Sequence, residues 1–400
     1  MKRGTGIIVC AWLAGCGGDD ALPMPELDTL ESLGEALFSE TALSANRTQS
    51  CATCHNPDRG FIDDRLGEGG RISPVSLGDN GVSYGDRNAP SAAYAAFAPA
   101  FELGTRTRFN KQTSNRLYEG PLGGLFYDGR ATSLEEQAAG PPLSAVEMGM
   151  PSKVAIAERL AGGRRYQEAF NFLFGPGILD DPNAAYEAMT QSIAAYERTE
   201  LFSPFDSKYD RFLRGDDTLS FKELTGRALF FSEFANCGVC HQLHNNGDPV
   251  NRFVETFTGY EYHNIGIPVN DAARTLSGAS EDLGLESALG ENEFRGLFRT
   301  PTLRNIAVTE PYMHNGVFQD LRTVIEFYDH FNNPDARTNN PETNAPWRDP
   351  ENPETVATNL LRIGRAMSDL EVESMVCFLR TLTDARYEAL IEPKGIDCAN

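Results

Sequence analysis

The sequence predicts a mainly α-helical protein made of two similar domains, with little β structure. Most regular segments repeat apolar residues at helical spacing, whereas the alternating pattern of a β-strand is sparse. A short motif, C-x-x-C-H, occurs twice, at residues 51–55 and 237–241, and similar segments flank both copies. A chain of 400 residues is long enough for two or three domains, each with its own core.

Each C-x-x-C-H motif predicts a covalently bound haem. Its spacing lets two thiols add to the two vinyl groups of one haem, while the adjacent His binds the iron. A single match could instead be a zinc half-site or a redox-active pair, but two matches, each with its His, favour two c-type haems. The predicted attachment and ligand residues are Cys51, Cys54 and His55 for the first haem, and Cys237, Cys240 and His241 for the second.

The N-terminus predicts export. Lys2 and Arg3 precede an apolar run at residues 7–13 that is too short to span a bilayer. The small residues before Cys16 resemble a bacterial lipoprotein cleavage site, so we predict a signal peptide at residues 1–15 and lipid attachment at Cys16. An ordinary secretory signal is the alternative. Either way we expect the periplasmic side of a Gram-negative bacterium, with membrane contact only through the lipid anchor.

Charge limits the partners. The formal net charge is −22, and removing residues 1–15 with Lys2 and Arg3 makes it −24, which argues against nucleic acid. An acidic surface suits a basic redox partner. Cys377 and Cys398 lie outside the haem motifs, and both a disulfide and two free thiols are compatible with the sequence.

An internal repeat defines the two domains. Residues 33–38 and 225–230 are similar and lie upstream of the two haem motifs, so each predicts a helix that leads into a haem loop. Residues 192–199 match residues 374–381 in pattern, and each predicts a closing helix. The second closing helix carries a capping box, Ser368 with Glu371.

A helix before the haem and a helix at the end are what a small cytochrome c domain needs to hold its cofactor. We therefore predict two cytochrome c-like haem domains, at residues 24–205 and 217–390.

The repeat continues through the middle of each domain. Residues 88–91 parallel residues 299–302, and residues 127–129 parallel residues 314–316. Twelve residues after Gly129 stands Pro141, and twelve after Gly316 stands Tyr328. Pro141 has no atom that binds iron, whereas Tyr328 has a phenol oxygen.

Tyr328 is our candidate ligand for the second haem. Asp320 can cap a helix in which Leu321, Val324, Ile325 and Tyr328 share the buried face. Two alternatives stay open: Tyr328 is a core aromatic, or Met313 is the ligand, because small cytochromes commonly use Met opposite His. By the same helical geometry His330 points to solvent, and His244 is expected to be exposed.

Several segments together resemble one known family over nearly the whole mature chain. They are R-N-A-P at 87–90, F-Y-D-G-R at 126–130, L-E-E-Q at 134–137, V-E-M at 146–148, T-P-T-L-R-N at 300–305 and P-Y-M-H-N-G at 311–316. With the two haem motifs, they resemble the bacterial di-haem cytochrome c peroxidase and MauG superfamily. The resemblance implies that hydrogen peroxide reacts at the first haem and that the second haem transfers electrons.

The resemblance also assigns a branch. The position that matches Tyr328 is Met in the peroxidase branch and Tyr in the MauG branch, so this chain sides with MauG. Peroxidase-branch enzymes carry a second His some sixteen residues beyond the first haem His, whereas this chain has Arg71 there. The first haem is therefore expected to be open on its far side, next to Pro141.

Further site residues follow from the resemblance. Glu147 matches the catalytic Glu, which can relay a proton between the two peroxide oxygens, although a solvated loop carboxylate is the plain alternative. Tyr127 stands where the family usually has a Trp between the haems. His314 is expected in a haem pocket. The resemblance places one calcium ion between the haems; the matching positions are Asn88, Thr309 and Pro311, with a turn residue as the alternative for Asn88.

These observations predict a di-haem peroxidase that uses hydrogen peroxide to oxidise an external donor through a Tyr-ligated second haem. A Tyr oxygen favours the higher charge states of iron, and the MauG branch oxidises partner proteins by long-range electron transfer, so we expect a protein substrate. The first alternative is peroxide detoxification with a small cytochrome or copper protein as electron donor. The second is a non-catalytic di-haem electron-transfer cytochrome.

Overall fold

The computed structural model describes residues 1, 26–108, 117–243 and 254–399, and in these ranges it is mainly helical. The predicted signal peptide beyond Met1, Cys16 and His244 lie outside the described residues. The helices are α1 (Leu30–Phe38), α2 (Cys51–Cys54), α3 (Leu134–Ala138), α4 (Lys153–Ala161), α5 (Arg164–Phe174), α6 (Pro182–Glu197), α7 (Lys208–Arg214), α8 (Phe221–Phe230), α9 (Asp271–Ser277), α10 (Glu286–Leu289), α11 (Leu321–Asp329), α12 (Thr358–Leu361) and α13 (Asp369–Arg380). The strands are β1 (Glu102–Thr107), β2 (Leu117–Leu122), β3 (Tyr262–His263) and β4 (Phe298–Arg299).

The predicted helix pairs are present in both halves and pack in the same register. A Cβ atom on Gly34 of α1 would lie 2.0 Å from the Ser192 carbonyl oxygen of α6, and one on Gly226 of α8 would lie 1.9 Å from the Ser374 carbonyl oxygen of α13. Only glycine permits this approach of two helices. The prediction that residues 192–199 correspond to residues 374–381 is confirmed.

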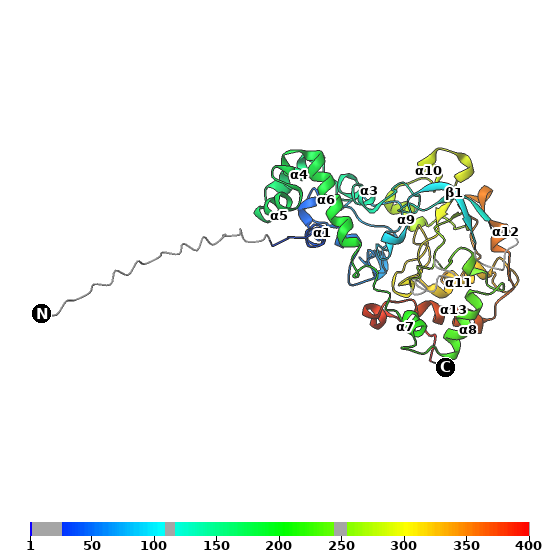
Figure 1. Cartoon of the computed structure of the whole chain (residues 1–400). Coiled ribbons are helices and arrows are strands. Elements are labelled where there is room, and N and C mark those ends of the chain that lie inside the picture. The colour runs from blue at the N-terminus through cyan, green and yellow to red at the C-terminus, as the bar shows by residue number, and fades with distance from the viewer. Residues whose placement is uncertain (2–25, 109–116, 244–253, 400) are drawn as a thin grey trace.

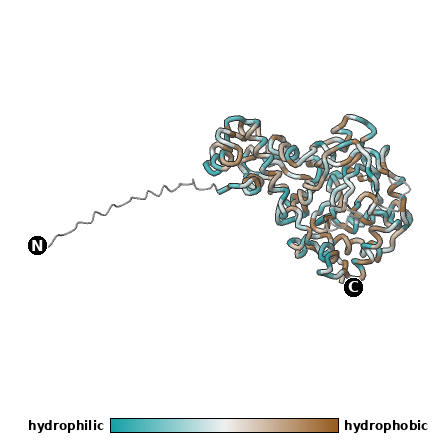
Figure 2. The backbone as a smooth tube through the Cα atoms, in the orientation of Figure 1, coloured by the Kyte–Doolittle hydropathy of each residue, from teal (hydrophilic) through white to brown (hydrophobic). Residues whose placement is uncertain are grey.

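Two hydrophobic cores follow the two halves. The first contains buried apolar residues from Leu27 to Phe202, and the second runs from Tyr209 to Ile396. Figure 1 shows α1, α4, α5 and α6 gathered at one end of the molecule and α7, α8, α11 and α13 at the other. Hydrophobic and hydrophilic segments interleave at both ends (Figure 2). Helix α7 lies in the segment predicted to join the domains, and its Tyr209 belongs to the second core.

The middle of the repeat also folds alike in both halves. An isolated β-bridge joins Leu125 to Ala131 in the first half, and the matching bridge joins Tyr312 to Phe318 in the second. Inside these loops Phe126 and Met313 both have positive φ, 61° and 73°. The two loops therefore have the same unusual backbone, as the predicted alignment requires.

A helix follows each of these loops, but the two helices differ in length. Ser133 caps α3 and Asp320 caps α11. Helix α3 ends at Ala138, shortly before Pro141, whereas α11 continues to Asp329. Proline has no amide hydrogen for a helix and clashes with the preceding turn. Pro141 and Tyr328 thus hold equivalent positions, one just past a short helix and one inside a long helix.

The halves interlock across a hairpin. Strands β1 and β2 pair antiparallel, and Leu122 at the end of β2 bridges to Glu261 beside β3. Buried Arg108, just after β1, donates to the carboxylate of Glu261, with Nη2 and Oε2 2.7 Å apart. Strands β1 and β2 of the first half therefore contact the half of the molecule that contains the second haem motif.

Two further features concern the ends of the chain and the membrane. Cys377 of α13 and Cys398 form a disulfide, which resolves the alternative left open by the sequence. Helix α13 begins with the predicted capping box of Ser368 and Glu371. Within the described ranges, no helix combines the length and the apolar character needed to cross a membrane.

Candidate haem sites

The two motif histidines are held in the same way. Nδ1 of His55 lies 3.2 Å from the carbonyl oxygen of Phe61, and Nδ1 of His241 lies 3.0 Å from that of Phe257. A carbonyl only accepts, so Nδ1 carries the hydrogen and Nε2 keeps a lone pair for a metal. Burial lowers the pKa of both rings, that of His241 to about 4, so both are neutral as an iron ligand must be.

The backbone around the two histidines repeats as well. Phe61 and Phe257 both have positive φ, 56° and 53°. The hydroxyl of Ser91 donates to the Gly60 carbonyl, and the hydroxyl of Thr302 donates to the Thr256 carbonyl. The predicted correspondence of residues 88–91 with residues 299–302 is therefore confirmed.

The four motif cysteines fit haem attachment. None of them forms a disulfide. Burial raises the pKa of Cys51, Cys54 and Cys237 to about 12, so these thiols are not redox-active thiolates. In the part of the chain that the structure describes, no group of three or more His, Cys, Asp or Glu side chains could hold a free metal ion, so a zinc half-site finds no further ligands. Apolar thiols beside a histidine with a free Nε2 are what a c-type haem requires.

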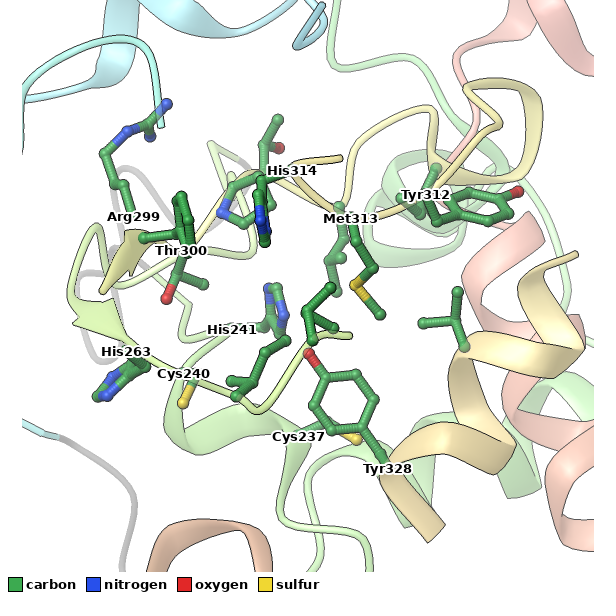
Figure 3. A pocket seen from close by; sticks show the side chains of 18 of the residues that line it. Cys237, Cys240, His241, His263, Arg299, Thr300, Tyr312, Met313, His314 and Tyr328 are labelled. Carbon is green, nitrogen blue, oxygen red and sulfur yellow. The ribbon is translucent and has the colours of Figure 1, made fainter. Parts of the chain in front are cut away.

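A mostly apolar cavity of about 280 Å³ adjoins the second motif. Cys237, Cys240 and His241 lie on its wall. Figure 3 shows that the hydroxyl of Tyr328 and the thioether of Met313 are both directed into it. Both candidate ligands therefore reach the space that the second haem would fill.

The buried face predicted for the helix of Tyr328 is present. Leu321, Val324, Ile325 and Tyr328 all line this cavity, and Asp320 caps α11 by accepting from the Arg322 amide. Burial raises the pKa of Tyr328, and the nearby thiols of Cys240 and Cys237 raise it further. In the protein alone Tyr328 is thus a neutral phenol, and a positive metal centre would be needed to bind its oxygen as a phenolate.

The prediction that His330 points to solvent was wrong. Its ring is half-buried and lies 4.0 Å from the ring of Phe331 and 5.3 Å from that of Trp347, measured between centroids. The cause is the segment after α11, which folds back and brings Trp347 onto the helix end. A helical wheel cannot show this long-range contact.

The segment that carries Pro141 and Glu147 is a fixed turn. The Met148 amide donates to the Pro141 carbonyl at 3.2 Å, and the Asp79 amide donates to the Glu147 carbonyl at 2.7 Å. The side chain of Asp79 accepts from the amides of Asn46 and Thr48, just before the first haem motif. These bonds tie Glu147 to the first haem's attachment segment.

The carboxyl of Glu147 is suited to proton transfer. Burial raises its pKa, and a hydrogen bond from Ser144 opposes that effect. Arg130 also lowers the pKa, whereas Asp86 raises it. A carboxyl whose pKa lies above the usual range exchanges a proton closer to neutral pH. By accessible surface the side chain of Glu147 is partly exposed, so solvent also reaches it.

Tyr127 and His314 lie together on the cavity wall that faces the first half. Their ring centroids are 6.5 Å apart, and the ring of His314 stacks on Phe298 at 3.6 Å. Burial raises the pKa of Tyr127 to about 12, with Arg299 and Arg87 opposing it, and burial lowers the pKa of His314 to about 4. Nε2 of His314 is buried, has no hydrogen-bond partner among the described residues and lies 4.0 Å from Oδ2 of Asp282.

The three predicted calcium positions also meet at this cavity. Asn88, Thr309 and Pro311 all line it. The amide of Asn88 donates through Nδ2 to the Pro74 carbonyl at 3.2 Å, and its backbone amide donates to the His314 carbonyl at 2.8 Å. All three residues carry oxygen atoms, the type of ligand that calcium prefers.

Two charged residues near these sites were not among the predicted site residues. Arg87 lies between two carboxylates from different parts of the chain, 2.6 Å from Asp128 and 2.7 Å from Asp282. Glu197, at the end of α6, is buried without an ion-pair partner among the described residues. For Glu197 the signal was present in the repeat, because it aligns with Leu379, an apolar residue.

The helical fold, the repeated histidine sites and the partly buried motif thiols define the chain as a di-haem c-type protein. Residues 28–218 match the family model for di-haem cytochrome c peroxidase. The chain is 46% identical over 399 residues to the methylamine utilization protein MauG of Paracoccus denitrificans, covering 98% of each chain. It belongs to the di-haem cytochrome c peroxidase and MauG family. Like that family, it is an oxidoreductase that binds two c-type haems and acts on peroxide.

Two other similarities agree with this membership. The chain is 32% identical over 310 residues to the cytochrome-c peroxidase IdrP1 of a Pseudomonas species, covering 74% of this chain and 71% of that one. The crystal structure of the diheme peroxidase BthA from Burkholderia thailandensis superposes with a TM-score of 0.75 at 30% identity, covering 93% of this chain and 90% of that one.

Proposed function

We propose that this di-haem peroxidase works in the manner of MauG and oxidises a protein partner through a Tyr-ligated second haem. The observation that carries the proposal is Tyr328, whose hydroxyl points into the cavity beside His241 from the position where the first half has Pro141. The high identity to a MauG protein supports the same branch.

Three residues of the first half have different roles at the proposed peroxide site. His55 would hold the first haem, and Pro141, which has no metal-binding atom, would leave room for peroxide. The bound haems would supply the redox chemistry by accepting the oxidising equivalents of peroxide. Glu147 would take a proton from one peroxide oxygen and return it to the oxygen that leaves as water.

The residues of the second half set the potential of the second haem. His241 would hold the iron through Nε2, and Tyr328 would hold it through the phenol oxygen after losing its proton. An oxygen donor favours the higher charge states of iron. Tyr127 and His314 lie together on the side of the first half. Asn88, Thr309 and Pro311 would hold a calcium ion near them.

The partner and the compartment follow from chemistry. A chain with a net charge of −22 fits a protein substrate with a basic docking face. Haem attachment at C-x-x-C-H and the N-terminal signal support a periplasmic location, with Cys16 as the lipid-anchored first residue.

One observation favours a second candidate function. The thioether of Met313 also reaches into the cavity, and a Met-ligated haem has a higher potential. With Met313 as ligand the second haem would store an electron, and the enzyme would detoxify peroxide with electrons from a small cytochrome or a copper protein.

Mixing the fully oxidised protein with peroxide separates the two functions. The Tyr328 proposal expects a fast change in the absorption of both haems without any prior reduction. The Met313 function expects little reaction until one electron has been added to the second haem. A requirement for that electron in the wild-type protein would overturn the proposed function.

A further inference from the structure

Glu197, the last residue of α6, is a buried carboxyl to which the proposed function gives no role. Only 5% of its surface is exposed. Its neighbour Arg198 turns outward, and Nη1 of Arg198 lies 2.8 Å from Oε1 of Glu135 in a half-exposed ion pair. The arginine next in sequence therefore pairs with a carboxylate at the surface and not with Glu197.

The internal repeat places Glu197 at the first haem. A Cβ on Gly34 would meet Cβ of Tyr196 at 2.8 Å, and a Cβ on Gly226 would meet Cβ of Phe378 at the same distance. The residue after Tyr196 is Glu197, and the residue after Phe378 is Leu379. Leu379 lines the cavity beside the second haem motif. By this register Glu197 faces the corresponding space at the first haem motif.

The influence of the Glu197 charge on Cys51 also places Glu197 near the first haem motif. After burial, the charge of Glu197 is the strongest influence on the thiol of Cys51, and it acts more strongly than that of Cys54 in the same motif. Cys51 is the first attachment cysteine, so Glu197 lies near the haem edge that carries the thioether bonds.

A buried carboxyl at this position destabilises the fold. The second half has a leucine at the equivalent position, whereas the carboxyl loses its hydration and has no ion-pair partner among the described residues. Burial raises the pKa of Glu197 to about 8, with Arg198 lowering it and Glu135 raising it. A group that titrates near neutral pH responds to a change of charge close by, as groups at functional sites do.

We propose that Glu197 couples a proton to each electron that enters or leaves the first haem. As the ferric iron takes up one electron from the reductant of the peroxidase, the Glu197 carboxylate binds one proton from solvent, and the site gains no net charge. When that electron leaves, the carboxyl releases the proton. The inference rests on the first haem bound at Cys51, Cys54 and His55, and it does not depend on the ligand of the second haem.

The elements around Glu197 offer a short route for this proton. Helix α3 contributes Glu135, which is about one-third exposed and pairs with Arg198, so solvent lies next to the buried carboxyl. The charges on the other packed elements act elsewhere. Glu35 of α1 influences Tyr196, Arg159 of α4 donates to the backbone carbonyls of residues 42, 44 and 45, and Asp180 lies at the opposite end of α6.

The test is a redox titration of the holoprotein at a series of pH values, with each haem followed by its own absorption. In the wild type we expect the midpoint potential of the first haem to fall as the pH rises between about 6 and 9, because deprotonated Glu197 stabilises the ferric state. Glu197→Gln and Glu197→Leu remove this slope, and Glu197→Asp keeps it. The second haem serves as the internal control, and Glu158→Gln, on the exposed side of α4, as the matched variant.

A second readout observes the proton itself. Infrared difference spectra between the oxidised and reduced wild type should gain a protonated carboxyl band on reduction, and this band should be absent in Glu197→Gln. Glu197→Leu introduces the residue that the second half has at this position, so we expect it to fold. It tests the proposal if Glu197→Gln does not fold. A wild-type slope retained in either variant would overturn the proposal, as would a wild-type potential that does not change with pH in this range.

Discussion

Pro141 and Tyr328 occupy the same position in the two halves of the molecule, each twelve residues after the glycine of a matching loop. The loops share a β-bridge and a residue with positive φ, and each leads into a capped helix. The helix of the first half stops before Pro141, and that of the second half carries Tyr328 to its cavity. One fold thus places a residue without an iron-binding atom in one half and a candidate iron ligand in the other.

Replacing Glu147 by Gln should slow the reaction with peroxide by about 10²–10⁴-fold, because an amide cannot accept and return the proton. Stopped-flow absorption at the first haem measures this rate. Since burial raises the pKa of Glu147, the wild-type rate should fall on acidification with a midpoint above the usual range of a Glu. The acid limb should vanish in the variant. Glu158→Gln is the control, and an equal rate in the Glu147 variant would remove this residue from the mechanism.

Replacing Arg87 by Met should destabilise the fold by about 3–5 kcal/mol, because buried Asp282 loses its arginine and buried Asp128 keeps only the half-exposed Arg130. Thermal or denaturant unfolding of the holoprotein measures the change. As the control, Arg348→Met breaks an exposed pair with Asp271 and should cost no more than about 1 kcal/mol. An equal decrease in the free energy of unfolding in both variants would show that the buried ion pair contributes no more stability than the exposed one.

The same ion pair predicts a loss of stability in acid. Burial alone would raise the pKa of Asp282, but the hydrogen bonds and charge of Arg87 hold it at about 2. An unfolded Asp has a pKa of about 3.9. The pair therefore stabilises the fold fully above that value, and its contribution is lost as the pH falls from about 4 through about 2. The wild type should lose more stability than Arg87→Met over this range.

Replacing Gly226 by Ala should force α8 and α13 apart, because the new Cβ would lie 1.9 Å from the Ser374 carbonyl oxygen. We expect a loss at or above the upper end of about 1–3 kcal/mol, the range for overpacked cores. Calorimetric unfolding is the measurement. In Gly162→Ala the nearest atoms lie 3.4 Å from the new Cβ, so stability should hardly change. A mild effect at Gly226 would mean that the helix pair can shift without cost.

The sequence predicted the repeated parts of this protein well, because each pattern was present twice. The spacing of the motifs that begin at Cys51 and Cys237 is enough to predict haem attachment. The matching segments that contain Gly34 and Gly226 predict the two helix pairs. Counting from two glycines paired Pro141 with Tyr328 correctly. Contacts between segments far apart in the chain could not be predicted in this way. Arg87 shows no local pattern that points to Asp282, and His330 is covered by Trp347, which arrives from a segment without regular structure.

The burial of Glu197 was not predicted from the sequence. The repeat aligns it with Leu379, but only the packing of α1 on α6 shows that both residues turn inward. A helix end with Glu followed by Arg is typical of a solvated surface, and here only the Arg follows that pattern.

Ferric absorption and paramagnetic resonance spectra of the holoprotein identify the ligand of the second haem. In the wild type we expect one open high-spin haem and one six-coordinate haem. Tyr328→Phe should change only the six-coordinate signal, and Met313→Leu should leave both signals unchanged. Two six-coordinate low-spin haems in the wild type, or a spectrum that Tyr328→Phe leaves unaltered, would contradict this expectation.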